Sequence, residues 1–322
     1  MKRLRLAVFG VGHMGTLHAR KVAERQQQQG DVELVGVADR DGDRVQGIAT
    51  ELGVRAVTDP RELFSSADAA IVAVPTVAHF DLCSAALEAG LDVLVEKPIA
   101  VSLDEGEGLV KLAEQRGQVL QVGHQEWFND AMRVARERIT APRFAEIHRM
   151  GPFTERATDV DVVRDLMIHD IEILQQLLGE EPVQVDAVGV PVLTDKVDIA
   201  NARITFENAC VANLTASRVS SPLRRFRLFQ RDAYFSIDFL EKKAGLFRRI
   251  REEGGEPKIE FEELRTDPGD ALLAQLGLYL EAVRKRETPA QGERGITGAE
   301  GVAALRTALR VIDAMPDLEG LS

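Results

Sequence analysis

Cysteine and long apolar runs are both scarce in this chain. The 322 residues include only Cys83 and Cys210, which lack the paired spacing of a zinc site or a disulfide framework. A reducing compartment therefore suits the chain, and no metal site is predicted. No stretch reaches the roughly 18 apolar residues of a membrane-spanning helix, and segment 6–9 is too short for a signal peptide. We expect a cytoplasmic protein that does not enter a membrane.

An excess of positive charge is also missing. The chain has 52 acidic and 40 basic residues, for a formal net charge of -12. Proteins that bind nucleic acid usually present a basic face to the phosphates, so no nucleic-acid partner is expected. A few local arginines can still hold an anionic small molecule. The G-x-S-x-G motif of an α/β hydrolase is absent as well.

What the sequence does contain is an alternating pattern over its first 120 or so residues. Short, nearly unbroken apolar runs predict strands at 4–9, 33–38, 69–74, 92–95 and 119–122. Longer amphipathic runs predict helices at 14–27, 43–52, 78–89 and 103–116. Buried strands separated by helices indicate an α/β domain with a doubly wound parallel sheet. We place this domain at 1–122.

The pattern changes in the remaining residues, 123–322. Helices are predicted at 130–139 and 166–178, with a strand at 144–150. Extended segments follow at 183–188, 200–206, 211–217, 225–230, 233–237 and 258–262, and helices at 271–286 and 298–315 close the chain. Several extended segments alternate polar and apolar residues, which is typical of an antiparallel sheet with one wetter face. A second, α+β domain is therefore expected, and the last helix could belong with either domain.

A glycine-rich loop joins the first predicted strand to the first helix, with the sequence Gly10-Val11-Gly12-His13-Met14-Gly15. Such a loop lets the backbone approach a pyrophosphate at a helix N-terminus. Asp39 ends the second strand, where a carboxylate can bind the adenosine ribose and disfavours the 2′-phosphate of NADP. Arg40 could stack on adenine, pair with that phosphate or be a solvated turn residue. The loop predicts NAD binding, with NADP left open.

Glu96-Lys97-Pro98 follows the fourth predicted strand. The carboxyl ends of parallel strands are where open α/β sheets bind ligands, so Lys97 is a candidate site residue. Taken alone, the tripeptide is more typical of a surface ion pair before a proline. The Lys97–Pro98 bond could be cis.

Asp165 and His169 are four residues apart, so a helix would place them on one face. A histidine exchanges protons near neutral pH, and a neighbouring carboxylate can orient it. The pair is thus a candidate for acid–base chemistry. Spacing alone somewhat favours a helix start with an incidental histidine.

Taken together, these motifs resemble the Gfo/Idh/MocA oxidoreductase family over nearly the whole chain. The resemblance rests on the glycine loop, Glu96-Lys97-Pro98, Asp165 with His169, and the segments 73–79 and 296–301. It implies a large, open, mostly antiparallel second sheet that binds substrate and makes homodimers or homotetramers. It also implies that Lys97, Asp165 and His169 are catalytic and contact substrate, and that Pro75, His79, Glu96 and Lys97 join the glycine loop, Asp39 and Arg40 at the cofactor.

Segments 122–129, 161–170 and 215–220 are similar to the UDP-N-acetylglucosamine 3-dehydrogenase branch of that family. This likeness implies a nucleotide sugar as substrate, with a ring hydroxyl as the group that is oxidised. Its phosphates need basic partners, and Arg156, Arg164 and Arg218 are the predicted ones. Arg224, Arg225 and Arg227 are further candidates, although they also fit a solvated strand face. The alternatives are an inositol or free-sugar dehydrogenase of the same family and a dinucleotide-sensing regulator without catalysis.

Overall fold

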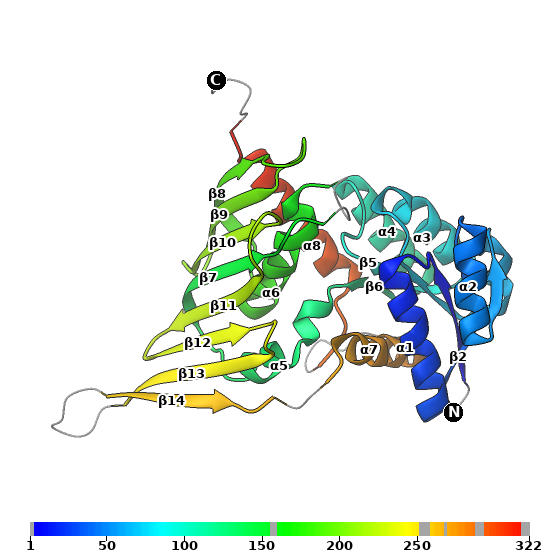
Figure 1. Ribbon diagram of the computed structural model, residues 1–322, viewed down its shortest axis with the longest axis horizontal. Helices are drawn as coiled ribbons and strands as arrows, with labels where there is room; N and C mark the ends of the chain where they lie inside the picture. The colour runs from blue at the N-terminus through cyan, green and yellow to red at the C-terminus, as the bar shows by residue number, and fades with distance from the viewer. Residues whose placement is uncertain (1–2, 155–159, 251–257, 267–268, 287–292, 317–322) are drawn as a thin grey trace. The chain divides into compact units, whose positions relative to one another are not determined.

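The computed structural model describes residues 3–154, 160–250, 258–266, 269–286 and 293–316 (Figure 1). The chain forms two compact units, each built from two segments. The first comprises Met1–Gln125 and Leu272–Val302, and the second comprises Glu126–Ala271 and Ala303–Ser322. A single boundary near residue 122 does not describe this division, because the chain returns to the first unit after completing most of the second.

The first unit is built on a six-stranded parallel sheet with the order β3-β2-β1-β4-β5-β6. This is the strand order of a dinucleotide-binding Rossmann fold, which confirms the predicted doubly wound sheet. Its strands are β1 (Leu4–Phe9), β2 (Val32–Ala38), β3 (Arg55–Val57), β4 (Ala69–Val72), β5 (Asp92–Glu96) and β6 (Leu120–Gly123). Its helices are α1 (His13–Gln29), α2 (Gly42–Leu52), α3 (His79–Glu88), α4 (Leu103–Arg116) and α7 (Ala271–Lys285), with short 3₁₀ turns at Pro60–Ser66 and Thr76–Ala78.

Helix α7 shows why the first unit needs a late segment of the chain. Leu276, Tyr279 and Leu280 are almost fully buried and share one apolar core with strands β1 and β2 and helices α1 and α2. The Tyr279 hydroxyl also donates a hydrogen bond to the carbonyl oxygen of Ala70 in β4, at 3.3 Å. Helix α7 lies beside α1 (Figure 1), where Gly277 faces the Arg25 guanidinium. The helix therefore covers part of the parallel sheet.

The second unit contains an eight-stranded sheet in the order β14-β13-β12-β11-β7-β10-β9-β8. Only β7 and β10 pair in parallel, so the prediction of a large, mostly antiparallel sheet is confirmed. The strands are β7 (Pro142–Met150), β8 (Pro182–Val190), β9 (Ile199–Phe206), β10 (Val211–Ser217), β11 (Leu223–Gln230), β12 (Ala233–Asp238), β13 (Lys243–Ile250) and β14 (Lys258–Leu264). Helices α5 (Asp130–Arg136) and α6 (Ile168–Leu178), the 3₁₀ turn Gln125–Phe128 and most of α8 (Gly298–Asp313) accompany it.

The two faces of this sheet differ in character. One face buries alternate residues such as Ile147, Leu214 and Phe226 in a core shared with α5, α6 and the later turns of α8. On the opposite face, neighbouring strands align a row of aromatic rings with centroids 4.3 to 5.6 Å apart, made by Phe144, Phe229, Tyr234, Phe247 and Phe261. Figure 1 shows the helices of this unit on one side of the sheet. The aromatic face is thus open in the part of the unit that the structure describes.

The last helix, α8, begins in the first unit and continues into the second. At its start, Gly298 and Gly301 lie so close to Leu120 and Val122 of β6 that a side chain would collide with them. Its later residues, including Ala304, Ala308 and Val311, belong to the core of the second unit. Among the described helices, none is long and apolar enough to cross a membrane.

Candidate functional site

The glycine loop has the geometry that its sequence predicts. Gly10 has a φ of +82°, and a Cβ on it would lie 2.6 Å from the carbonyl oxygen of Ala73 at the end of β4. A side chain on Gly15 would collide with the carbonyl oxygen of Gly10. Around Gly12, in contrast, an added Cβ meets no atom within 4 Å. Gly10 and Gly15 therefore shape the loop, whereas Gly12 leaves open space in front of α1.

This open space lies at the N-terminus of α1. Gly12 is the N-cap and carries no side chain to bond the first amides of the helix, and the first turn has no acidic residue. His13 is exposed and Met14 is half-buried in that turn. Uncapped amides and the positive end of the helix dipole favour an anion such as a pyrophosphate. The loop therefore fits a dinucleotide.

Asp39 has a structural contact in addition to its predicted position. Its carboxylate accepts hydrogen bonds from the backbone N–H groups of Val11 at 2.8 Å and Asp41 at 3.0 Å. The Arg44 guanidinium lies 3.5 Å away, a partner that sequence reasoning missed. Asp39 thus ties the end of β2 to the glycine loop, while Arg40 is exposed. A carboxylate at this point disfavours a second phosphate on the ribose.

Lys97 follows β5, and its backbone is held by buried groups on both sides. The Lys97–Pro98 peptide bond is cis. The Glu96 carboxylate lies 2.7 Å from His18 Nε2 on α1 and accepts a hydrogen bond from the Lys97 N–H at 3.3 Å. Burial opposes ionisation of Glu96, but His18 and Lys97 outweigh it and lower the pKa of Glu96. A Cβ on Gly123 would lie 2.9 Å from the same carboxyl carbon, so this pairing also requires that glycine.

His79 holds the other side of this turn. Its Nδ1 lies 2.9 Å from the carbonyl oxygen of Pro98, and its Nε2 lies 2.9 Å from the carbonyl oxygen of Val74. Burial lowers the pKa of His79, so the neutral ring prevails and donates to one of these oxygens at a time. His79 and Glu96 are therefore buried supports of the loops that carry Pro75 and Lys97. Pro75 is exposed and Lys97 is half-exposed.

His124 follows β6 and is fully buried. Burial and the positive charge of Lys97 lower the pKa of His124 to about 3. The side chain is consequently neutral at physiological pH. The complete burial of His124 favours a structural role.

In the second unit, Asp165 and His169 lie at a change of helix type that the sequence did not reveal. The segment Val163–Met167 forms a π-helical turn, and α6 begins directly after it at Ile168. Asp161 caps the turn by accepting hydrogen bonds from the N–H groups of Val163 and Arg164. Single π-turns within helices are frequent at functional sites. Asp165 is half-buried within the turn, and His169 is buried in the first turn of α6.

The predicted phosphate-binding arginines have different environments. Arg218 is 5% exposed, and its guanidinium donates to Asp198 at 2.7 Å, to the carbonyl oxygen of Val160 at 2.8 Å and to Thr194 at 3.1 Å. These contacts give Arg218 a structural role, and its contact with substrate stays a prediction. Arg164 is about one-third exposed, 3.6 Å from Asp161. Arg156 lies outside the described residues.

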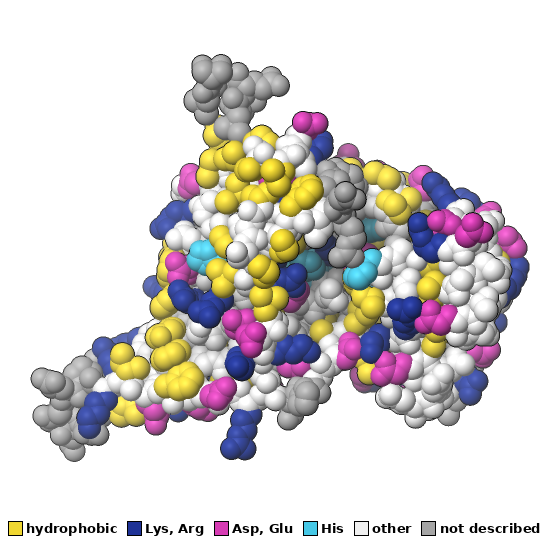
Figure 2. All heavy atoms as spheres, viewed as in Figure 1, with side chains coloured by type: hydrophobic (Ala, Val, Ile, Leu, Met, Phe, Trp, Pro, Cys, Tyr) yellow, Lys and Arg dark blue, Asp and Glu magenta, His cyan; other side chains and the backbone are white. Residues whose placement is uncertain are grey.

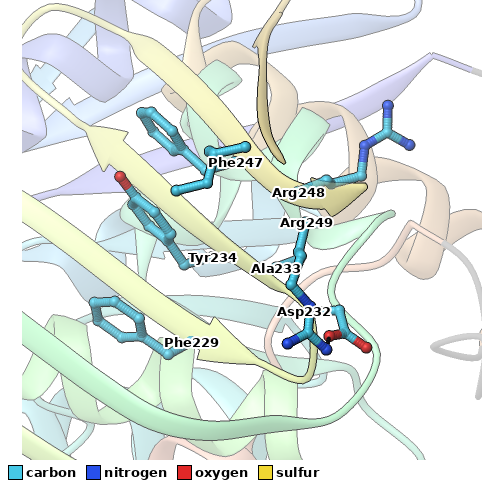
Figure 3. A pocket seen from close by; sticks show the side chains of 8 residues that line it. Phe229, Asp232, Ala233, Tyr234, Phe247, Arg248 and Arg249 are labelled. Carbon is cyan, nitrogen blue, oxygen red and sulfur yellow. Dashed lines mark ion pairs between the residues drawn. The ribbon is translucent and has the colours of Figure 1, made fainter. Parts of the chain in front are cut away.

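The described residues outside this region include a hollow but no metal cluster. Within the described ranges, no group of three or more His, Cys, Asp or Glu side chains could hold a metal ion. A shallow hollow instead lies on the open aromatic face (Figure 3), lined by Phe229, Asp232, Ala233, Tyr234, Phe247, Arg248, Arg249 and Ile259. It belongs to strands β11 to β14 and not to the π-turn or α6.

Comparison with known proteins agrees with this geometry. Residues 4–124 match the model described as "Oxidoreductase family, NAD-binding Rossmann fold", and residues 132–235 match the Gfo/Idh/MocA C-terminal domain. The chain belongs to the Gfo/Idh/MocA oxidoreductase family. The predicted family, the dehydrogenase class and the NAD cofactor are thereby confirmed.

Individual relatives in this family differ in how much of the chain they match. A UDP-N-acetylglucosamine 3-dehydrogenase of Acidithiobacillus ferrooxidans is 39% identical over 88% of this chain and 90% of its own length. A scyllo-inositol 2-dehydrogenase (NAD(+)) of Bacillus subtilis is 30% identical over 68% of each chain. The solved structure of the UDP-N-acetylglucosamine 3-dehydrogenase GnnA from A. ferrooxidans superposes with a TM-score of 0.88, at 36% identity over 98% of both chains. The likeness to the nucleotide-sugar enzyme thus spans both units.

Proposed function

We propose that this protein oxidises the 3-hydroxyl of UDP-N-acetylglucosamine with NAD as the oxidant. One observation supports this substrate above the alternatives: the 39% identity to a UDP-N-acetylglucosamine 3-dehydrogenase extends over about nine-tenths of both chains. The inositol dehydrogenase of B. subtilis matches only about two-thirds of the chain and at lower identity. Particular side chains at the site, and not the fold, decide which substrate is accepted. The higher identity over more of the chain therefore favours the nucleotide sugar over an inositol.

His169 is the proposed general base. As the ring hydroxyl becomes a ketone, its proton passes to an imidazole nitrogen of His169, and the hydrogen on the same carbon leaves as a hydride. Bound NAD supplies the hydride acceptor. His169 is buried in α6 directly after the π-turn, which limits its motion and its contact with water. A positioned base of this kind contributes roughly two to four powers of ten in rate.

Lys97 and Asp165 have complementary roles in this proposal. The Lys97 ammonium donates a hydrogen bond to the reacting oxygen and stabilises its developing negative charge. The buried contacts of Glu96 and His79 with residues 97 and 98 fix the backbone from which this side chain extends. Asp165, half-buried in the π-turn, orients the substrate hydroxyls.

The diphosphate of the substrate requires positive charge from the second unit. Arg164 is the described candidate, because its side chain is about one-third exposed and its one described carboxylate partner, Asp161, is 3.6 Å away. Arg224 also remains a candidate, with 40% of its side chain exposed at the start of β11. Arg156 stays a proposed contact on the family resemblance alone.

We further propose that two or more copies of the chain associate through the open face of the second sheet. The aromatic row on this face includes Phe261, which is 58% exposed. At the other edge, apolar side chains gather over β8 (Figure 2), where Val188, Val190 and, just after the strand, Val192 are exposed. Exposed apolar patches of this kind commonly mark a protein interface. The two buried, free thiols suit a cytoplasmic location.

Purified protein supplied with NAD and either UDP-N-acetylglucosamine, N-acetylglucosamine or myo-inositol tests the substrate. A carbonyl reagent should be included to trap the ketone and draw the reaction forward. We expect NADH to form with UDP-N-acetylglucosamine. Without the UDP group, kcat/KM should fall by at least about a hundredfold, because the charge-assisted hydrogen bonds to the diphosphate no longer contribute to binding free energy. Faster reduction with myo-inositol would make the protein an inositol dehydrogenase. Tight NAD binding with no reduction by any sugar would favour a sensor.

A further inference from the structure

A network of four charged side chains, with the buried residues Arg149 and Asp170 at its centre, lies next to the proposed base. Arg149 of β7 is 2% exposed, and its Nε and Nη2 donate to the two carboxylate oxygens of Asp170 at 2.9 and 2.8 Å. Its Nη1 donates to Glu126 Oε1 at 3.0 Å. Arg224, directly opposite Arg149 on the paired strand β11, donates to the same Glu126 oxygen at 3.2 Å. The network therefore joins two strands, the 3₁₀ turn Gln125–Phe128 and α6.

Asp170 gives this network a connection to the chemistry. It is the residue immediately after His169, it is 2% exposed, and it lies in the first turn of α6. A guanidinium that pairs with both carboxylate oxygens fixes the direction of the carboxylate as well as its distance. Arg149 itself is fixed by Glu126 and by the Phe239 ring, whose centre is 5.3 Å from the guanidinium carbon. The contact between Arg149 of β7 and Asp170 consequently fixes how the first turn of α6 is rotated about the helix axis relative to the sheet.

The π-turn makes such a fixed point necessary. Its N–H groups reach one residue further back than those of an α-helix, so the turn changes the rotation of every residue that follows it. Without an external contact, the direction of His169 would depend on how regularly this turn forms. The bond from Asp170 to Arg149 sets that direction from outside the helix.

We propose that Arg149 and Asp170 are positioning residues that hold the His169 imidazole in its reactive orientation. Stability alone is a weak explanation for their pairing, because apolar residues of similar volume often replace a buried ion pair without loss of stability. What the ion pair adds is a defined direction. The catalytic consequence rests on the proposed function, whereas the orientation of the ring does not.

Kinetics of three variants separate positioning from stability. Asp170→Asn keeps the size of the side chain and loses its charge, and Arg149→Lys keeps the charge and loses the paired geometry. The double variant Arg149→Met with Asp170→Leu replaces the pair by apolar groups and protects the fold. We expect kcat to fall roughly tenfold to a hundredfold in all three, the scale of a misplaced reacting group, with KM for the sugar changing less than about threefold.

Asp92→Asn is the matched control. Asp92 is also fully buried and paired with an arginine, Arg286, but it lies at the start of β5, at the opposite end of that strand from Lys97. This change should lower the melting temperature and leave kcat within about twofold, since no reacting group moves. A double variant that is as stable as the unaltered protein and retains full kcat would overturn the proposal.

A second readout needs no substrate. The chain has six histidines, so the imidazole signals of labelled protein can be followed by NMR and assigned with His169→Gln. We expect the chemical shifts of the His169 ring to change in Asp170→Asn and to stay unchanged in Asp92→Asn. Unchanged His169 signals in Asp170→Asn would refute the positioning role. If the unaltered protein oxidised no sugar, the proposed function would fail while this measurement still decided the orientation.

Discussion

The three glycines of the loop, Gly10, Gly12 and Gly15, have different structural roles. Gly10 and Gly15 have no room for a side chain, whereas Gly12 has open space around its α-carbon. All three were predicted from the sequence as cofactor residues, and only the structure separates those that shape the loop from the one that leaves room. A side chain at Gly10 or Gly15 should therefore disturb the fold, whereas a side chain at Gly12 should weaken NAD binding and leave the fold intact.

Gly12→Val should leave the fold intact and weaken NAD binding. The added side chain meets no protein atom within 4 Å at its Cβ, but it enters the space in front of the α1 amides. We expect at least a tenfold rise in the NAD dissociation constant by calorimetry, since the pyrophosphate approaches the backbone there. Gly47→Ala in α2 is the control, also in open space, and should leave NAD affinity unchanged while slightly raising the melting temperature. Equal NAD affinity in Gly12→Val would remove this loop from the cofactor site.

His124 should make the stability of the protein depend on pH. Its pKa is about 3 when folded and about 6.5 when unfolded, so the unfolded chain binds the proton more readily. The stabilisation is complete above pH 6.5 and is lost as pH falls towards 3, by roughly 1.4 kcal/mol for each pH unit. Denaturant unfolding of His124→Gln should therefore show a weaker pH dependence between pH 6.5 and 4. A slope equal to that of the unaltered protein would place a charged His124 in the folded state.

Other contacts at the residue scale had no signal in the sequence. The proposed roles of Glu96 and His79 follow from His18, Pro98 and Val74, which are brought to them by folding. Arg149 and Asp170 are 21 residues apart, with no motif linking them. Arg218 carried the right charge for a phosphate, but the buried Asp198 beside it could not be foreseen. Motifs identify residues, whereas long-range partners decide what each one does.

At the scale of elements, the sequence predicts most helices and strands, and β1, α4 and β10 agree to the residue. Two strands were missed for local reasons. β3 has three residues with one buried, and β13 has glycine within it and two arginines near its end, which hide its alternation. The π-turn was missed because a single wider turn leaves the apolar spacing almost unchanged. Helix α7 was predicted, but its return to the first unit depends on packing that spacing does not encode.

The start of α8 carries a capping box that accounts for its fixed position. Thr297 Oγ1 and N–H both donate to Glu300 Oε2 at 2.8 Å, and the Glu300 N–H donates back to Thr297 Oγ1 at 3.3 Å. Thr297→Ala should lower the free energy of unfolding by about 1 kcal/mol, and Thr297→Ser should restore most of it. Chemical denaturation measures both. No loss of stability in Thr297→Ala would mean that packing against β6 alone holds this helix end.

At the scale of the whole molecule, the open aromatic face should control the association of copies. Tyr234 stacks between Phe229 and Phe247 at 5.3 and 4.3 Å, so Tyr234→Asp places a charge in the middle of the row. Burying an unpaired carboxylate is costly, and the variant should sediment with a smaller mass than the unaltered protein. Val101→Asp, at another exposed apolar residue, should keep the original mass. An unaltered protein that is already monomeric would contradict this proposal.

In the proposed reaction, hydride leaves carbon 3 of UDP-N-acetylglucosamine while His169 takes the proton. UDP-N-acetylglucosamine with deuterium on that carbon tests it most directly, with mass spectrometry of the nicotinamide after a single turnover. We expect deuterium in the reduced cofactor, slower transfer than with unlabelled sugar, and a further loss of rate by about a hundredfold or more in His169→Gln. Reduced cofactor without deuterium would place the reaction at another carbon, and full activity of His169→Gln would assign the proton to a different group.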